Sequence, residues 1–166
     1  MLIQQNVNGS NFFNRSWAEF KVGFNDSSGN YWLGNELLSQ LTVNRRYKLR
    51  FDLQSRWYAY RWLHAEYTTV KVLSEADNYE LLVAGYSGDA TDALASEHNG
   101  MAFTTYDRDN DKDSKNCALW TGGGFWYNSC GRAIVNGNGD RFSWSQLIGG
   151  NTGSHLLSSR MWLLCK

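Results

Sequence analysis

The sequence predicts an α+β domain, in which a central antiparallel sheet with short helices precedes a loop-rich C-terminal part. Three observations lead to this fold class. Residues 14–41 contain two short helical patterns, residues 47–83 contain consecutive strand patterns, and the chain from about residue 98 is rich in loop-forming residues. Helices followed by a run of strands are typical of α+β proteins. The 166 residues show no repeat and no linker, so we expect a single domain.

The first elements are a strand and two helices. Residues 1–9 alternate polar with apolar positions and predict a strand at the edge of the sheet. A short amphipathic helix is predicted over 14–23, because Trp17 and Phe20 are three residues apart and Gly23 can end it. Residues 29–36 form a turn into a buried aromatic segment, and a second short helix follows over 36–41.

The strands come next. Residues 47–53 alternate cleanly, which predicts a strand with positions 47, 49, 51 and 53 facing inward. Further strands are predicted over 57–63, 68–73 and 78–83. We therefore divide the domain into a sheet-and-helix part over 1–97 and a loop-rich part over 98–166, which we expect to hold calcium and ligand.

Charge and hydropathy exclude several classes of protein. Sixteen basic residues balance sixteen acidic ones, so nothing indicates nucleic acid or an anionic membrane as the partner. No apolar run reaches the ~18 residues that a membrane span needs. Residues 1–6 are too polar for a signal peptide. The eight Trp, nine Tyr and eight Phe residues suit a core, and they also suit a sugar-binding surface.

The segment 107–117 (DRDNDKDSKNC) is the clearest candidate site. Its carboxylates occupy positions 107, 109, 111 and 113, and dense oxygen ligands are what Ca²⁺ requires. An EF-hand is excluded, because its sixth and twelfth positions would be Lys112 and Ala118 instead of Gly and Glu. The alternative is a solvated acidic turn, since three basic residues against four acidic ones leave 107–115 weakly charged.

The three cysteines suggest one disulfide and one remaining thiol. Cys117 and Cys130 are close in sequence, and closing their loop would contribute roughly 3 kcal/mol on the chain-entropy model. Cys165 is left to pair upstream, to link two chains in a homo-oligomer, or to stay free. Zinc is not indicated, because there is no C-x-x-C pair and the three histidines are scattered. Asn8, Asn14 and Asn25 lie in N-x-S/T sequons, which fit an extracellular protein.

Catalytic motifs are missing from the sequence. The run 122–124 (GGG) is not followed by Lys-Ser/Thr, so it is no phosphate loop, and there is no G-x-S-x-G nucleophile elbow. Paired carboxylates occur only in the segment assigned to metal. We therefore do not expect an enzyme.

The chain resembles the C-terminal fibrinogen-related domain, which fibrinogen chains, ficolins, tachylectin-type lectins, tenascins and angiopoietins share. The resemblance extends through most of the chain. It rests on the motifs at 14–17 (NRSW), 31–36 (YWLGNE), 41–42 (LT), 47–53 (YKLRFDL), 85–89 (GYSGD), 99–105 (NGMAFTT), 107–111 (DRDND), 116–118 (NCA), 124–127 (GFWY), 130 (C) and 136–137 (NG).

This resemblance implies a secreted domain with a Cys117–Cys130 disulfide. It also implies Ca²⁺ bound by the side chains of Asp109 and Asp111 and by the backbone carbonyls of Asp113 and Lys115. Asp107 would support this loop, and the peptide bond between residues 116 and 117 would be cis, as in many members.

Several positions depart from the family pattern. The family's N-terminal subdomain, with its own disulfide, is not in this sequence. The lectin members carry His after the second cysteine and Tyr four residues after the first, where this chain has Gly131 and Thr121. The knob-binding carboxylates of fibrinogen are replaced by Trp120 and Thr121, and the segment between 137 and Trp144 is about nine residues shorter than usual. Residues 159–165 resemble the ending of divergent invertebrate members, of a ficolin- or tachylectin-like kind.

Two hypotheses for function follow. The first is a calcium-supported lectin of innate immunity that recognises N-acetylated or sialylated glycans. Its ligand would contact an exposed aromatic at Trp120, with Trp126 expected in the core, and Arg132 could bind a carboxylate. The full set of candidate ligand-binding residues is Trp120, Thr121, Cys130, Gly131, Arg132 and Trp144. The second hypothesis is a protein-interaction or extracellular-matrix module with no sugar pocket.

Overall fold

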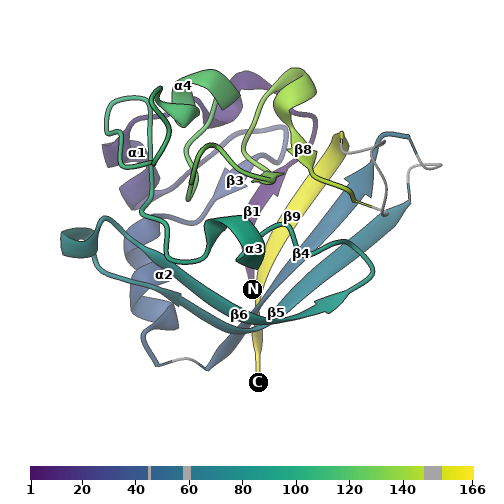
Figure 1. Ribbon diagram of the computed structural model, residues 1–166, viewed down its shortest axis with the longest axis horizontal. Helices are drawn as coiled ribbons and strands as arrows, with labels where there is room; N and C mark the ends of the chain where they lie inside the picture. Colours follow the sequence, from purple (N-terminus) through teal and green to yellow (C-terminus); the bar gives the residue numbers. More distant parts are fainter. Residues whose placement is uncertain (45, 58–60, 148–154) are drawn as a thin grey trace.

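The computed structural model describes residues 1–166 except 45, 58–60 and 148–154. Its main element is a seven-stranded sheet in the order β2-β3-β1-β9-β4-β5-β6, whose recorded strand pairs are all antiparallel. Two further short strands, β7 and β8, pair with each other in the loop-rich region. The predicted α+β class with an antiparallel sheet is confirmed (Figure 1).

The strands are β1 (Leu2–Asn6), β2 (Phe24–Asn25), β3 (Tyr31–Trp32), β4 (Tyr47–Ser55), β5 (Trp62–Val72), β6 (Leu81–Gly88), β7 (Ala133–Ile134), β8 (Ser143–Trp144) and β9 (Leu156–Cys165). The α-helices are α1 (Trp17–Val22), α2 (Asn35–Thr42), α3 (Ala95–His98) and α4 (Cys117–Thr121). The 3-10 turns are η1 (Asn11–Phe13), η2 (Glu75–Asp77) and η3 (Gly139–Arg141).

Both predicted helices are present, and local chemistry explains the bounds of α1. Ser16 accepts a hydrogen bond from the Glu19 backbone while the Glu19 side chain bonds back to the Ser16 backbone, which is a capping box. The helix ends at Gly23, whose φ of 91° lies in the region that favours glycine. A Cβ at Gly23 would lie 2.5 Å from the Leu33 carbonyl oxygen, so this close approach also requires glycine.

The central strands follow the predicted alternation, with one difference. Leu49, Phe51 and Leu53 of β4 are buried, as predicted, and position 47 is half-buried. The strand predicted over 68–73 falls in β5 up to Val72, but only residues 62–63 of the strand predicted over 57–63 do so. Residues 57 and 61 lie outside any strand, and residues 58–60 lie outside the described part of the chain. The buried positions of β5 change phase between Tyr67 and Val70, and this interruption divided the strand in the sequence pattern.

Two predictions about the ends of the chain are wrong. β1 is not an edge strand, because it lies between β3 and β9. Its polar side chains are buried and hydrogen-bonded: the Gln4 amide donates to the Asn136 side chain at 2.9 Å and to the Ser159 hydroxyl at 3.1 Å. The C-terminal segment is not loop, because residues 156–165 form β9, which is inserted between β1 and β4. The places of β1 and β9 in the sheet depend on pairing with strands that are distant in the sequence, and local sequence patterns do not reveal that pairing.

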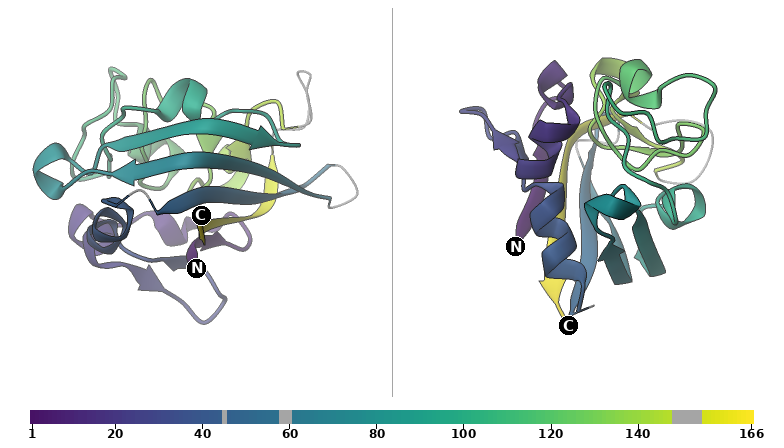
Figure 2. Two further views of the ribbon diagram at one scale, coloured as in Figure 1. Left: turned by 90° about the horizontal axis from the view of Figure 1, so that it is seen from below. Right: turned by 90° about the vertical axis from the view of Figure 1, so that its left-hand side faces the viewer.

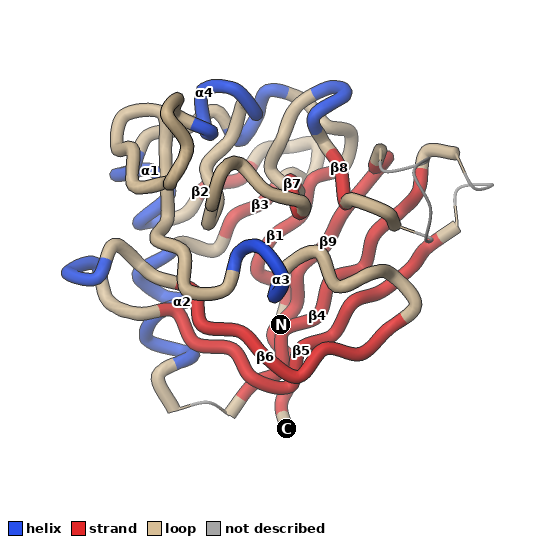
Figure 3. The backbone as a smooth tube through the Cα atoms, in the orientation of Figure 1, coloured by secondary structure: helices blue, strands red, loops and turns tan. Residues whose placement is uncertain are grey.

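The inner face of the sheet is covered by α2 and by the C-terminal loops. Leu38 of α2 and Trp126 of the loops pack with Leu49, Val70 and Met161 around one small enclosed space. Most of the described residues between α3 and β9 lie outside helices and strands (Figure 3). The first and last strands meet, since the Met1 amine donates to the Leu163 carbonyl at 2.8 Å (Figure 2). No helix among the described residues is long and apolar enough to cross a membrane.

Candidate functional site

The acidic segment 107–116 is anchored to the rest of the domain at its start. The Asp107 carboxylate accepts hydrogen bonds from the Trp17 backbone at 2.9 Å and from the Thr105 hydroxyl at 2.7 Å. Trp17 opens α1, so Asp107 also satisfies one of the free N–H groups at that helix start. The Asn110 amide donates to the Phe103 carbonyl at 2.8 Å. These bonds fix the segment against α1 and the core, which gives Asp107 the predicted supporting position.

Successive aspartates in this segment each accept a hydrogen bond from the backbone two residues later. Asp109 accepts from the Asp111 N–H at 3.3 Å, Asp111 from the Asp113 N–H at 3.0 Å, and Asp113 from the Lys115 N–H at 3.0 Å. The second oxygen of Asp111 accepts from the Cys117 N–H at 2.9 Å. These are Asx turns, which coil the segment tightly and leave further lone pairs on each carboxylate.

The proposed calcium ligands fit a cation on two observations. The Asp109 and Asp111 carboxylates lie side by side, and burial together with the Asp109 charge raises the pKa of Asp111. A cation between them would relieve this repulsion. In addition, no hydrogen bond from a described residue reaches the backbone carbonyls of Asp113 or Lys115, so both oxygens are available as ligands.

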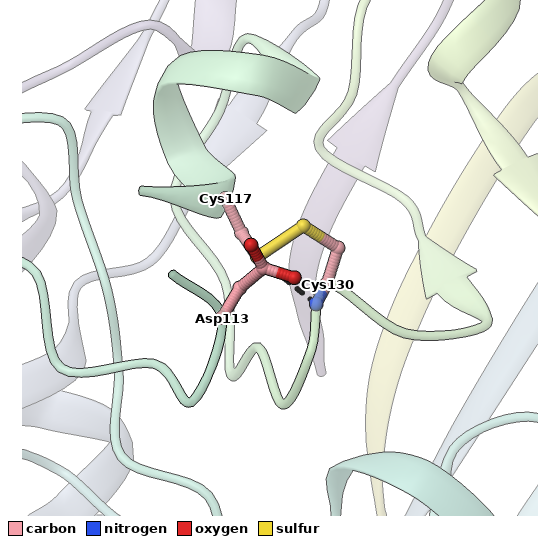
Figure 4. Close-up of side chains that lie close together, drawn as sticks. All are labelled: Asp113, Cys117 and Cys130. Atoms are coloured by element: carbon pink, nitrogen blue, oxygen red, sulfur yellow. Dashed lines mark hydrogen bonds between the residues drawn. A yellow bond between two sulfur atoms is a disulfide. The ribbon is translucent and has the colours of Figure 1, made fainter. Parts of the chain in front are cut away.

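The disulfide between Cys117 and Cys130 is confirmed, with a Cα–Cα distance of 5.2 Å. It joins the start of α4 to the loop before β7, and the Asp113 carboxylate lies within 4.8 Å of both sulfur atoms (Figure 4). Because both sulfurs are in the disulfide, neither is a thiolate ligand for a metal. The Ser129 hydroxyl donates to Asp113 at 2.7 Å and lowers the pKa of that carboxyl.

The expected cis peptide bond at residues 116–117 is not found, because the described residues contain no cis bond. Asn116 instead acts as the N-cap of α4, with an extended backbone and a side chain that accepts from the Leu119 N–H at 3.1 Å. The trans geometry lets Cys117 begin the helix and donate its N–H to Asp111.

A buried histidine holds the loop after the disulfide, and sequence reasoning missed it. His98 is fully buried, and its Nε2 accepts from the backbone N–H of Arg132 at 3.1 Å and of Ala133 at 3.0 Å. Nδ1 lies 2.6 Å from the Trp126 carbonyl, which assigns the proton to Nδ1 and makes the ring neutral. Burial lowers the pKa of His98 to about 4. The only sequence signal was its place directly before the 99–105 motif.

An open hollow of about 330 Å³ lies beside the disulfide, lined by Asp113, Lys115, Trp120, Ser129 and Cys130. Trp120 is half exposed, as predicted for an aromatic ligand contact. The lining of the hollow therefore combines an aromatic residue with residues that carry hydroxyl, carboxylate and ammonium groups. This is the combination that recognises a molecule with both apolar and polar faces.

The remaining candidate residues are placed differently. Thr121 is buried against the Tyr127 hydroxyl at 2.7 Å, and Trp144 is buried with its indole N–H donating to the Thr91 carbonyl at 2.9 Å. Neither side chain is open to a ligand in this structure. Gly131 and Arg132 are partly buried, and neither is among the residues lining the hollow. Trp126 lies in the core, as expected.

Together these features define an α+β domain in which a disulfide joins α4, at the end of an acidic loop, to the loop before β7. The comparisons with known proteins agree. Residues 1–156 match the family model for the fibrinogen beta and gamma chains, C-terminal globular domain, and the chain belongs to this family.

Individual relatives span several kinds of protein. The chain is 40% identical to human Ficolin-3 over 138 residues, covering 82% of this chain and 45% of that protein. It is 44% identical to the rat fibrinogen alpha chain over 151 residues, covering 82% of this chain and 19% of that protein. It is 40% identical to bovine Angiopoietin-4 over 136 residues, covering 82% and 27%. The chain thus spans less than half the length of these relatives.

Solved structures give the same fold. The fibrinogen-like globe domain of human ANGPTL2 superposes with a TM-score of 0.86 at 34% identity, covering 99% of this chain and 79% of that one. The lamprey fibrin D-dimer complexed with the peptide ligand Gly-His-Arg-Pro-amide superposes with a TM-score of 0.84 at 29% identity, covering 99% and 60%.

Proposed function

We propose that this domain is a calcium-supported recognition module that binds N-acetylated or sialylated glycans in the hollow beside Trp120. The half-exposed Trp120, which lines the same hollow as Asp113, Lys115 and Ser129, is the observation that carries the proposal. A sugar presents C–H groups on one face and hydroxyl groups around its rim. An aromatic wall opposite hydrogen-bonding groups complements both, and an acetyl methyl group adds apolar contact.

Calcium would be held by the carboxylates of Asp109 and Asp111 and by the carbonyls of Asp113 and Lys115. When bound, the ion would neutralise the acidic loop and fix its shape. The loop supplies Asp113 and Lys115 directly to the hollow, so ordering it orders one wall of the site. The chain's own bonds do the remaining positioning, since Ser129 holds the Asp113 carboxylate and the disulfide fixes Cys130.

The module would act outside the cell as a binding protein rather than as an enzyme. Disulfides persist in oxidising compartments, which supports an extracellular location. Single sugar sites are weak, and linked copies gain affinity through effective concentration. Cys165 is exposed and unpaired among the described residues, so it is available for such a link.

A second candidate function is binding to a protein. Leu119 is 66% exposed and Trp120 50% exposed, and both lie on α4; Tyr106 is 41% exposed and lies beside the Asn116 cap of that helix. Exposed apolar side chains gathered in this way are typical of interfaces. The lamprey fibrin D-dimer shows that a related chain forms a complex with a peptide.

A matched pair of variants separates these functions. Binding to immobilised N-acetylglucosamine and to immobilised glucose is measured for the wild type, Trp120→Ala and Leu119→Ala. The proposal predicts selective binding of the N-acetylated sugar, a loss of at least tenfold in Trp120→Ala, and little change in Leu119→Ala. Failure of the wild type to distinguish the two sugars would overturn the lectin function. If the domain binds a protein partner and both substitutions weaken that binding equally, the protein-binding function would be established.

A further inference from the structure

Trp120 belongs to two hollows rather than one. Besides the hollow next to the disulfide, its indole lines a second of about 500 Å³, whose other walls include Asn138, Arg141 and Ser143. Trp120 comes from α4 and Arg141 from η3, so the second hollow lies where these two short elements meet. A ligand lying across Trp120 would therefore reach both hollows at once.

The second hollow contains an arginine with free hydrogen-bonding capacity. The Arg141 guanidinium lies over the Trp120 ring, 4.7 Å from its centroid. Its side chain forms no hydrogen bond and no ion pair with any described residue, although its backbone is tied into η3. The contact with the indole restrains the guanidinium and leaves its N–H groups for an oxygen ligand. A guanidinium in this state suits the two oxygens of a carboxylate.

The neighbouring polar groups do not cancel this charge. Asp140 also lines the hollow, but its carboxylate pairs with Arg56 at 3.2 Å. The Asn138 amide donates to the Asn11 side chain at 2.9 Å, and the Ser143 hydroxyl donates to the Arg141 carbonyl at 3.2 Å. Arg141 is therefore the one cationic side chain that lines this hollow within the described chain.

Arg132, the arginine suggested by the sequence, is less well placed. Its guanidinium donates to the Gln146 side chain at 2.7 Å, and it lines neither hollow. Arg141 is therefore the better placed of the two arginines to bind an anion in either hollow.

We propose that Arg141 and Trp120 form a second subsite, which binds the carboxylate of an acidic sugar whose acetamido group occupies the first hollow. This inference rests on the proposed function and names its preferred ligand class. The two groups can come from one residue, as in N-acetylneuraminic acid, or from neighbours, as in a uronic acid linked to N-acetylglucosamine.

The test measures affinities by biolayer interferometry on three surfaces: N-acetylglucosamine, N-acetylneuraminic acid, and a glucuronic acid–N-acetylglucosamine disaccharide. For each variant we compare one ratio, the affinity for an acidic surface divided by the affinity for the neutral N-acetylglucosamine surface. The wild type is expected to prefer at least one acidic surface, and that surface identifies the source of the carboxylate. Arg141→Gln is expected to lower this ratio about tenfold. Arg141→Lys keeps the positive charge but lacks the planar guanidinium, and it is expected to lower the ratio by a smaller factor.

Two further variants complete the design. Arg132→Gln and Arg46→Gln are expected to keep the wild-type ratio; Arg46 lies beside Cys165. A ratio lowered by Arg132→Gln but not by Arg141→Gln would overturn the second subsite, as would a wild type with no acidic preference. Binding to the neutral N-acetylglucosamine surface would persist in both cases. The second subsite could therefore be refuted while the proposed function stands. No binding to any surface would overturn both.

Discussion

Replacing His98 with Phe should destabilise the domain more than most single substitutions. Phe nearly matches the ring in size, so the change removes polar atoms and leaves no large cavity. The backbone N–H groups of Arg132 and Ala133 would lose their acceptor, and the Trp126 carbonyl would lose its donor. A buried polar group without a partner costs about 1–3 kcal/mol. For three such groups we expect a loss of about 3–9 kcal/mol in the free energy of unfolding.

The assay is urea unfolding followed by tryptophan fluorescence, with His64→Phe as the matched control. His64 is half-exposed on β5 and its Nδ1 lies 3.0 Å from the Asp89 carboxylate, so its replacement should lower the free energy of unfolding by no more than about 1 kcal/mol. A loss below about 1 kcal/mol in His98→Phe would show that the two N–H groups find other partners. The role of His98 in holding the 130–133 loop would then be refuted.

Three further predictions concern pH, calcium and a glycine. The pKa of His98 is about 4 in the folded chain and near 6.5 when unfolded, so the neutral ring stabilises the fold above pH 6.5 and this contribution is lost as the pH falls towards 4. Unfolding titrations should show up to about 3 kcal/mol of this loss in the wild type and none of it in His98→Phe. Calcium at 100 times its Kd should stabilise the domain by about 2.7 kcal/mol, as measured by thermal unfolding. Asp111→Asn should reduce this gain and the 86%-exposed Asp140→Asn should keep it; an equal gain in both would refute the assigned ligands. Gly131→Ala should lower the free energy of unfolding by more than about 2 kcal/mol, because the φ of Gly131 is 113° and a Cβ would lie 2.4 Å from His98. A Cβ at Gly139 meets no atom within 4 Å, so Gly139→Ala should lower it by about 1 kcal/mol. Equal losses for the two variants in urea unfolding would contradict this reasoning.

Sequence patterns predicted the features that depend on neighbouring residues. The Trp17–Phe20 spacing, the glycine that ends α1, and the alternation of β4 are all local, and each was found where predicted. The Cys117–Cys130 disulfide was also anticipated, because the two cysteines are only 13 positions apart in the chain.

Features that depend on distant partners were not predictable in this way. Gln4 looked like an edge residue because its hydrogen-bond partners lie more than 130 positions later in the chain. The central place of β9 is set by pairing with β1 and β4, and nothing in its own sequence specifies those neighbours.

The candidate site shows the same division. Exposure of Trp120 was correctly predicted, whereas Thr121, the next residue, faces the interior because α4 turns it towards Tyr127. Arg141 and His98 act through contacts with residues 21 and 34 positions away. Neither contact leaves a periodic or motif signal, so both required the structure.

The most direct test of the central claim is a glycan array probed with the wild-type domain in calcium and again in EDTA. We expect binding to N-acetylated or sialylated glycans in calcium and a marked loss of that binding in EDTA. A folded domain that binds calcium but no glycan under either condition would contradict it. The hollow beside Trp120 would then have to be reassigned to a protein partner.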